Sequence, residues 1–307
     1  MVYIALIWVV AGSGRLSAQT DFYDLGSIRE IRIYFEEANW DHILDSLYVD
    51  GEEERLEGVV EIDGTRLEGV GIRYKGFSSV SVNRRKNPFN IKLDYTDPDQ
   101  HYQQINKLKL SNVIQDPSFV REVLSYEIGR KYMPASRANF ANVYINDTLW
   151  GLYTNVEAVN KDFLDLHYDS RRNAFFKCNP EALDLNGENA NLSNSPGTDV
   201  AQYHPLYELK SDDGWDRLYH LIDTLNNVPD SLHRVLNVDQ TLWMHAFNYA
   251  LINFDSYVVV APNAEESLQF GTSDFTWSMW FRTQTPCFDA TGTVSVNRVF
   301  MGIEDAA

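Results

Sequence analysis

Residues 69–92, GVGIRYKGFSSVSVNRRKNPFNIK, combine positive charge with glycines and hydroxyl groups. Successive side chains of a strand point to opposite sides, so Arg73 and Lys75 should share a face with Gly69 and Gly71. Glycines on that face would let a large anion approach both cations. The stretch supplies further hydroxyl and cationic groups: Ser78, Ser79, Arg84, Arg85, Lys86 and Lys92. Phosphate oxygens need several donors and compensating charge, so the stretch predicts a polyphosphate site. A solvated basic hairpin that balances acidic neighbours is the alternative, and the residues alone leave both open.

The rest of the chain is strongly acidic. Its 307 residues include 44 Asp and Glu against 26 Lys and Arg, a net charge of −18, and the isoelectric point is near 4.7. Such a surface repels nucleic acid and anionic membranes, so neither is an expected partner. Hydrophobic residues make up 44% of the chain, which is ample for a packed core.

Alternating strands are expected to position the cationic stretch. Residues 28–33 predict a strand and 36–47 a helix. Residues 57–75 predict a hairpin that turns at Asp63-Gly64, because this dipeptide favours two-residue turns. Residues 88–95 predict another strand, with Phe89, Ile91, Leu93 and Tyr95 on one face and Lys92 on the other.

The following segments add helices. A helix is expected from Asp116, with that residue as N-cap and an apolar stripe at Val120, Val123, Leu124 and Ile128. A hairpin over 140–157 should turn at Asn146-Asp147. Further helices are expected from Lys161, over 213–227 and over 239–254, with a long surface loop at 179–203. The body is therefore of the α+β class, strand-rich to about residue 157 and helix-rich to 254.

Several motifs, in their order and spacing, resemble the spore-coat H (CotH) secreted kinases. They are IRYKGFSS, RKNPFNIKL, DPSFVRE, VYINDTLWGLYTNVEAV, FFKCNPEALDL, YELK at 207–210 and ALINFDS, which together span about residues 28–256. The resemblance implies an atypical protein-kinase-like two-lobe fold, with a β-rich N-lobe and a helical C-lobe that is incomplete here. It also implies ATP with Mg²⁺ or Mn²⁺ as cofactors.

The resemblance assigns expected roles to individual residues. Arg73, Lys75, Ser78 and Ser79 match the strand and loop that cover the phosphates, and Lys86 or Lys92 would grip them. In kinases a helix glutamate holds such a lysine. Glu122 matches the family motif, whereas a helical wheel favours Glu127, and both stay open. Glu157 would lie near the adenine, although an ordinary carboxylate at a strand end is an equally good interpretation.

Asp255, in the motif INFDS, matches the aspartate that orients the acceptor hydroxyl and takes its proton. In the family, a His-Asn element and a Trp-Asp-x-Asp element follow and carry the metal ligands. Neither occurs after Asp255, so the metal ligands are unknown and most of the catalysis is expected to be lost.

The N-terminus reads MVYIALIWVVAGSGRLSAQT, an apolar run at residues 2–11 followed by small residues. The run is too short to span a bilayer and is typical of a signal peptide cleaved near Ala18, with a buried strand as the alternative. The mature protein is therefore expected to be secreted or held at the cell surface, without a membrane span. Cys178 and Cys287 lack metal-type spacing, and two unrelated thiols are expected rather than a disulfide.

The segment from Tyr257 onward resembles the start of a laminin-G-like or concanavalin-A-like jelly roll. In FTWSMWFRT, Phe275, Trp277, Met279 and Phe281 would share one face. Complete modules of this kind bind glycans or proteins, often with Ca²⁺. The change of pattern at 256/257 comes without a linker, which indicates a truncated or rearranged sequence.

The expected organisation is a signal peptide at 1–18, a kinase-like domain at 19–256 divided near residue 157, and a partial β segment at 257–307. The expected function is ATP-dependent phosphoryl transfer to Ser or Thr of extracellular or surface proteins, inactive in this chain. The alternative is a non-catalytic surface or adhesion protein with a lectin-like module that binds glycans or proteins.

Overall fold

The computed structural model describes residues 21–51, 54–76, 79–114, 116–178 and 190–251. A closed barrel of seven strands forms the N-terminal part, in the order β1-β2-β3-β4-β5-β7-β6. The strands are β1 (Arg29–Tyr34), β2 (Leu56–Ile62), β3 (Thr65–Tyr74), β4 (Phe89–Lys92), β5 (Lys107–Ser111), β6 (Ala138–Ile145) and β7 (Thr148–Val156). Neighbouring strands are antiparallel except β1 and β6, which pair in parallel and close the barrel.

Both predicted hairpins are present. Asp63 and Gly64 join β2 to β3, and Asn146 and Asp147 join β6 to β7, all four with positive φ. Two-residue turns with positive φ at both positions match the natural twist of antiparallel strands, and Asn, Asp and Gly adopt that conformation most readily. The local dipeptides therefore set the register of both hairpins.

Alternate side chains of the strands fill the barrel. The fully buried ones are Ile31, Ile33, Val60, Ile62, Val70, Ile72, Phe89, Ile91, Leu108, Leu110, Val143 and Tyr153. They form one continuous apolar cluster, to which Trp40 and Leu44 of helix α1 (Trp40–Val49) are added from outside. Since burial of one large apolar side chain stabilises a fold by about 1.5–3 kcal/mol, this interior is the main source of the barrel's stability.

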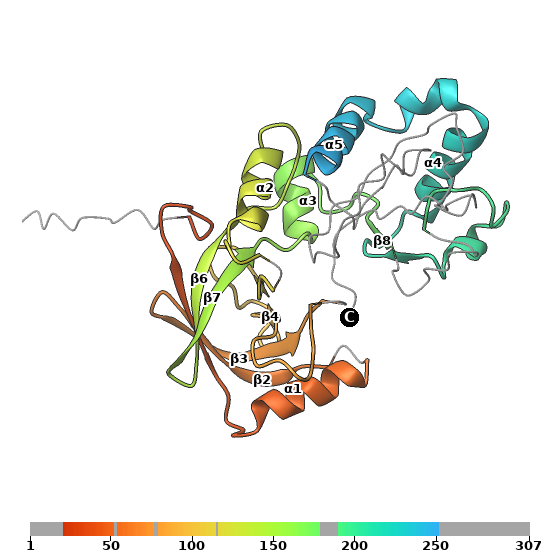
Figure 1. Ribbon diagram of the computed structural model, residues 1–307. Helices are drawn as coiled ribbons and strands as arrows, with labels where there is room; N and C mark the ends of the chain where they lie inside the picture. Colours follow the sequence, from red (N-terminus) through yellow and green to blue (C-terminus); the bar gives the residue numbers. More distant parts are fainter. Residues whose placement is uncertain (1–20, 52–53, 77–78, 115, 179–189, 252–307) are drawn as a thin grey trace, which may run out of the picture.

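The helices other than α1 lie at one end of the barrel (Figure 1). They are α2 (Arg121–Gly129), α3 (Lys161–Tyr168), α4 (Trp215–Asn227) and α5 (Val238–Ala250), with the short helices η2 (Val200–Tyr203) and η3 (Pro229–Arg234). Phe247 of α5 packs with Val123 and Tyr126 of α2 in a second cluster. A third cluster joins α4 to a small antiparallel sheet of β8 (Phe176–Cys178) and β9 (Tyr207–Leu209). None of the described helices is long and apolar enough to cross a membrane.

The mixed α+β class is confirmed, whereas the two-lobe kinase-like arrangement stays a prediction. Two local expectations were wrong. Tyr95 is 41% exposed and does not join Phe89 and Ile91 in the core. Helix α2 begins at Arg121 rather than after Asp116, because Phe119 adopts a left-handed conformation (φ 63°) that ends any helical run before it.

Candidate functional site

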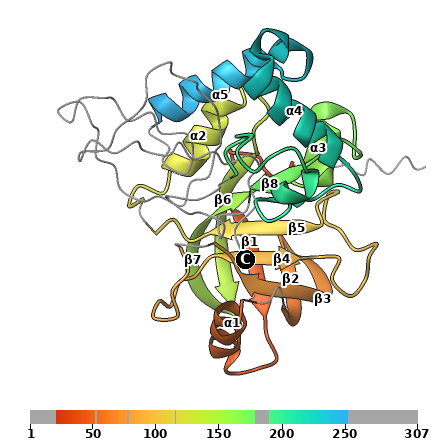
Figure 2. The ribbon, with the colours of Figure 1, turned by 90° about the vertical axis from the view of Figure 1, so that its right-hand side faces the viewer.

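A row of cations follows the outer face of the neighbouring strands β3, β4 and β5, which lie below helices α2 to α5 and above α1 in Figure 2. The inward residues of these strands are apolar, so the outward positions carry the charge. They are Arg73 on β3 and Lys75 directly after that strand, Lys92 on β4, and Lys107 and Lys109 on β5. We call these five cations the basic face.

The register brings the charges of the basic face together. Lys92 lies directly opposite Lys107, and only Asn90 separates Arg73 from Lys109 across the sheet. Like charges on opposed strands repel each other, and nearby acceptors or an anion reduce that repulsion. Arg73, Lys75 and Lys109 are 8%, 9% and 6% exposed, and low exposure strengthens their interaction with an anion.

Lys107 and Lys109 were missed by the sequence reasoning. The run Lys107-Leu108-Lys109-Leu110 has the strict alternation of a half-buried strand. That signal could have identified β5 and placed both lysines beside Arg73 and Lys75.

The glycines of β3 do not leave space for an anion, so that part of the sequence argument was wrong. A Cβ atom on Gly71 would lie 2.5 Å from the Tyr95 ring and 2.7 Å from Arg55 Cδ. Arg55 uses this approach to donate to the carbonyls of Gly71 and Asn90, at 3.2 and 2.9 Å. The side chain of Thr96 occupies the space over Gly69 in the same way. Gly69 and Gly71 therefore make room for neighbouring side chains. One of these side chains, Arg55, adds a further cation next to the basic face.

Lys75 is joined to helix α2 through a serine. Its Nζ donates to Ser111 Oγ at 3.5 Å, and Ser111 Oγ donates to Glu122 Oε1 at 3.3 Å. A cation on the central sheet, held from a helix carboxylate, is the arrangement that kinases use to grip nucleotide phosphates.

The preference for Glu127 over Glu122 gains no support from the geometry. Glu127 forms an ion pair with Arg130 of the same helix. The helical-wheel argument was wrong because Val120 and Leu124 are exposed, and α2 buries Val123, Tyr126 and Gly129 instead. Glu122 consequently faces the strands.

The loop 79–87 between β3 and β4 is held by two asparagines. Asn87 Oδ1 accepts from the N–H of Ser81 at 3.1 Å, and its amide donates to the carbonyls of Ser81 and Arg84. The Nδ2 of Asn112 donates to the carbonyl of Ser79, at 3.1 Å, and to that of Lys86, at 3.0 Å. Both ends of the loop are thereby fixed to the end of β5.

Lys86 points toward the barrel and not toward the basic face. Its Nζ donates to the carbonyls of Asn112 and Leu152 at 3.1 and 2.6 Å. It also lies over the rings of Phe119 and Tyr153, at 5.0 and 4.6 Å from their centroids. Burial lowers the pKa of Lys86 to about 8. These contacts give Lys86 a role in holding the loop 79–87.

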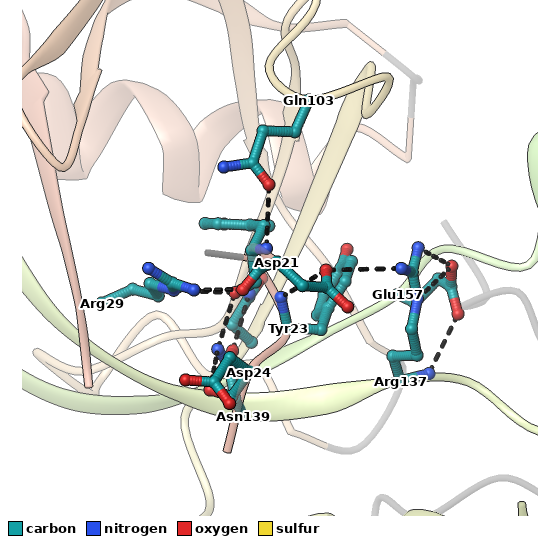
Figure 3. Close-up of polar contacts among 10 residues, drawn as sticks. Asp21, Tyr23, Asp24, Arg29, Gln103, Arg137, Asn139 and Glu157 are labelled. Atoms are coloured by element: carbon teal, nitrogen blue, oxygen red, sulfur yellow. Dashed lines mark hydrogen bonds and ion pairs between the residues drawn. The ribbon is translucent and has the colours of Figure 1, made fainter. Parts of the chain in front are cut away.

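The Glu157 carboxylate accepts three hydrogen bonds from Arg137 (Figure 3). Its Oε1 accepts from Arg137 Nε and Nη2 at 3.0 and 2.6 Å, and its Oε2 accepts from the Arg137 backbone N–H at 2.9 Å. Arg137 Nη1 continues to Asp21 at 3.4 Å, and its guanidinium stacks over Tyr23. These contacts favour a structural role for Glu157, which ties the N-terminal segment to the end of β7.

Two candidate residues, Ser78 and Asp255, lie outside the described residues, as do Cys287 and the segment from Tyr257. Within the described ranges, no group of three or more His, Cys, Asp or Glu side chains could hold a metal ion.

The fold and the basic face together define a domain with the groups needed to bind phosphate. Residues 72–281, more than half of the chain, match the family described as CotH kinase protein, and the chain belongs to this family. A kinase of this kind in general uses ATP, a divalent metal and a protein substrate. No curated protein matches the chain. The matched range includes the basic face, Ser111, Glu122 and Asp255.

Proposed function

We propose that this protein is a CotH-type kinase domain that binds the phosphates of ATP on the basic face. The observation that carries the proposal is the chain of contacts from Lys75 through Ser111 to Glu122. Arg73 and Lys75 would form charge-assisted hydrogen bonds with phosphate oxygens, each about twice as strong as a neutral hydrogen bond. Lys92 and Lys109 would add long-range attraction, and Glu122 would keep the Lys75 ammonium oriented through Ser111.

The proposed reaction is phosphoryl transfer to Ser or Thr of an extracellular or surface protein. Asp255 would orient the acceptor hydroxyl and accept its proton. A divalent metal, when bound, would neutralise charge on the β- and γ-phosphates. The described residues do not gather ligands for that metal, and the sequence after Asp255 contains neither a histidine nor a Trp-Asp pair. We therefore propose nucleotide binding with little or no transfer for this 307-residue chain.

Nucleotide binding is tested by thermal denaturation with Mg-ATP and Mn-ATP. Binding at a hundredfold excess over Kd stabilises by about 2.7 kcal/mol, which raises Tm by about 5–10 °C for a domain of this size. Lys75→Ala should abolish the shift, while Lys131→Ala, at an exposed lysine after α2, should keep it. Absence of a shift in the wild-type chain with either metal would refute the proposal.

Transfer is tested separately with γ-labelled ATP and a mixture of secreted proteins. We expect no label above the Asp255→Asn background. Measurable transfer would contradict the proposed inactivity and leave nucleotide binding intact.

A further inference from the structure

We propose that Ser111 and Asn112, the last residue of β5 and the one after it, are the positioning residues of the phosphate site. Ser111 sets Lys75 relative to Glu122, and Asn112 holds the loop 79–87 against the barrel. Neither residue is assigned a contact with ATP. The inference rests on the proposed function, because it concerns the same site.

Ser111 stands where three elements meet. Its backbone is fixed in the sheet by pairing with Thr154 of β7. Its hydroxyl accepts from Lys75, the residue after β3, at 3.5 Å and donates to Glu122 of α2 at 3.3 Å. A hydroxyl has one donor and two acceptor sites, so it can serve an ammonium and a carboxylate together. The Lys75 ammonium is thereby set by a rigid strand as well as by the helix.

Asn112 fixes both ends of the loop that follows β3. Its side chain is among the buried polar groups, at 5% exposure. Both amide hydrogens are used, one for the carbonyl of Ser79 and one for that of Lys86. The Asn112 carbonyl in turn accepts from Lys86 Nζ at 3.1 Å. Three hydrogen bonds between one residue and the loop leave it little freedom to swing away from the basic face.

The two roles are coupled because Ser111 ends β5 and Asn112 follows it directly. A shift of the end of β5 would move Lys75, Glu122 and the loop together. Misplacement of a binding group by about 1 Å can cost two orders of magnitude in rate. A substitution that displaces these groups should therefore weaken ATP binding even when it leaves the number of charges unchanged.

The test measures Mg-ATP affinity by titration calorimetry on the full chain, well below the Tm of each variant. Ser111→Ala removes a hydrogen bond to charged partners and should weaken binding about tenfold. Ser111→Thr keeps the hydroxyl and should restore affinity to within about twofold, because a β-branched residue fits a strand.

Asn112→Ala should weaken binding about tenfold or more, since two hydrogen bonds to the loop are lost. Asn139→Ala is the matched control. Asn139 is also buried and also donates to two carbonyls, those of Phe22 and Asp24, but it lies on β6 away from the basic face. Its substitution should lower Tm and leave Mg-ATP affinity unchanged.

The outcomes separate the two proposals. If the wild-type chain does not bind Mg-ATP, the proposed function and this inference fall together. If it binds, and Ser111→Ala and Asn112→Ala bind equally well, only the positioning role is overturned. Loss of affinity in Ser111→Thr equal to that in Ser111→Ala would also overturn it, because the hydroxyl would then not matter.

Discussion

Arg137 and Glu157 are bound to each other through side chain and backbone at once. The Arg137 guanidinium and backbone N–H donate to the Glu157 carboxylate, and the Glu157 N–H donates to the Arg137 carbonyl at 2.8 Å. The carboxylate is 9% exposed, so its bonds are shielded from water. The pair lies where β7 ends, four residues before α3 begins at Lys161.

Glu157→Gln should destabilise the fold without weakening ATP binding. Glutamine offers one oxygen in place of two and turns an N–H₂ group toward Arg137, so about 2 kcal/mol of unfolding free energy should be lost. Asp147→Asn, in an exposed ion pair with Arg32, is the matched control and should cost less than about 1 kcal/mol. Denaturant unfolding and Mg-ATP titration give both quantities. A loss of affinity with unchanged stability would instead support a place beside the adenine.

Lys86 should make stability rise with pH in alkaline solution. Its pKa is about 8 in the folded chain and 10.5 as a free side chain, so between these values only the unfolded state holds the proton. The unfolding free energy should increase through this window, by at most about 1.4 kcal/mol per pH unit. Lys86→Met should remove this part of the slope. Identical slopes in both proteins would show that Lys86 is not desolvated.

His245 should make stability fall in mild acid. Burial on α5 lowers its pKa from 6.5 to about 3, so below pH 6.5 the unfolded state gains a proton that the folded state does not. The unfolding free energy should therefore decrease as the pH falls from about 6.5 toward 5, by up to about 1.4 kcal/mol per pH unit. His245→Gln should flatten this part of the curve. The same change at the exposed His233 is the matched control.

Gly71→Ala should be destabilising because its Cβ would meet Tyr95 and Arg55. Overpacking of this kind typically costs about 1–3 kcal/mol. Tyr95→Ala combined with Gly71→Ala should recover part of that loss, since the ring is 41% exposed and contributes little by itself. If the double variant were as unstable as Gly71→Ala alone, contact with the Tyr95 ring would not be the cause of the destabilisation. Double-mutant unfolding measurements decide between the two.

The sequence predicted the two hairpins, because their turns and strands depend on residues that are close together in the chain. Asp63-Gly64 and Asn146-Asp147 specify their turns by backbone preference, and alternation around them specifies the strands. The closed barrel was not predicted, because Arg29 pairs in parallel with Ala141 and no short-range pattern reports such a contact. The same applies to Lys75 and Glu122, which Ser111 brings together from three separate elements.

The sequence identified the cationic residues of this region, but it did not show which groups each side chain contacts. Arg73 lies on β3 and Lys75 directly follows it, as the alternation of this stretch predicted, while their role as phosphate ligands stays a prediction. Lys86 donates to backbone carbonyls of its own chain, a contact that charge alone does not reveal, and its expected role toward phosphate stays a prediction. Glu127 was favoured because Val120 and Leu124 were taken to be buried, although tertiary packing turned another side of α2 inward.

The parallel pairing of β1 with β6 also sets an order of events in folding. Strands β1, β2 and β3 can pair as soon as they are synthesised, because each is antiparallel to the next in sequence. The second edge of β1 stays open until residues 141–145 exist. An open strand edge pairs readily with other chains, and long-range closure is slow. A nascent chain that stops before β6 would therefore be prone to aggregation, and the barrel becomes self-contained only when β7 joins β6 to β5.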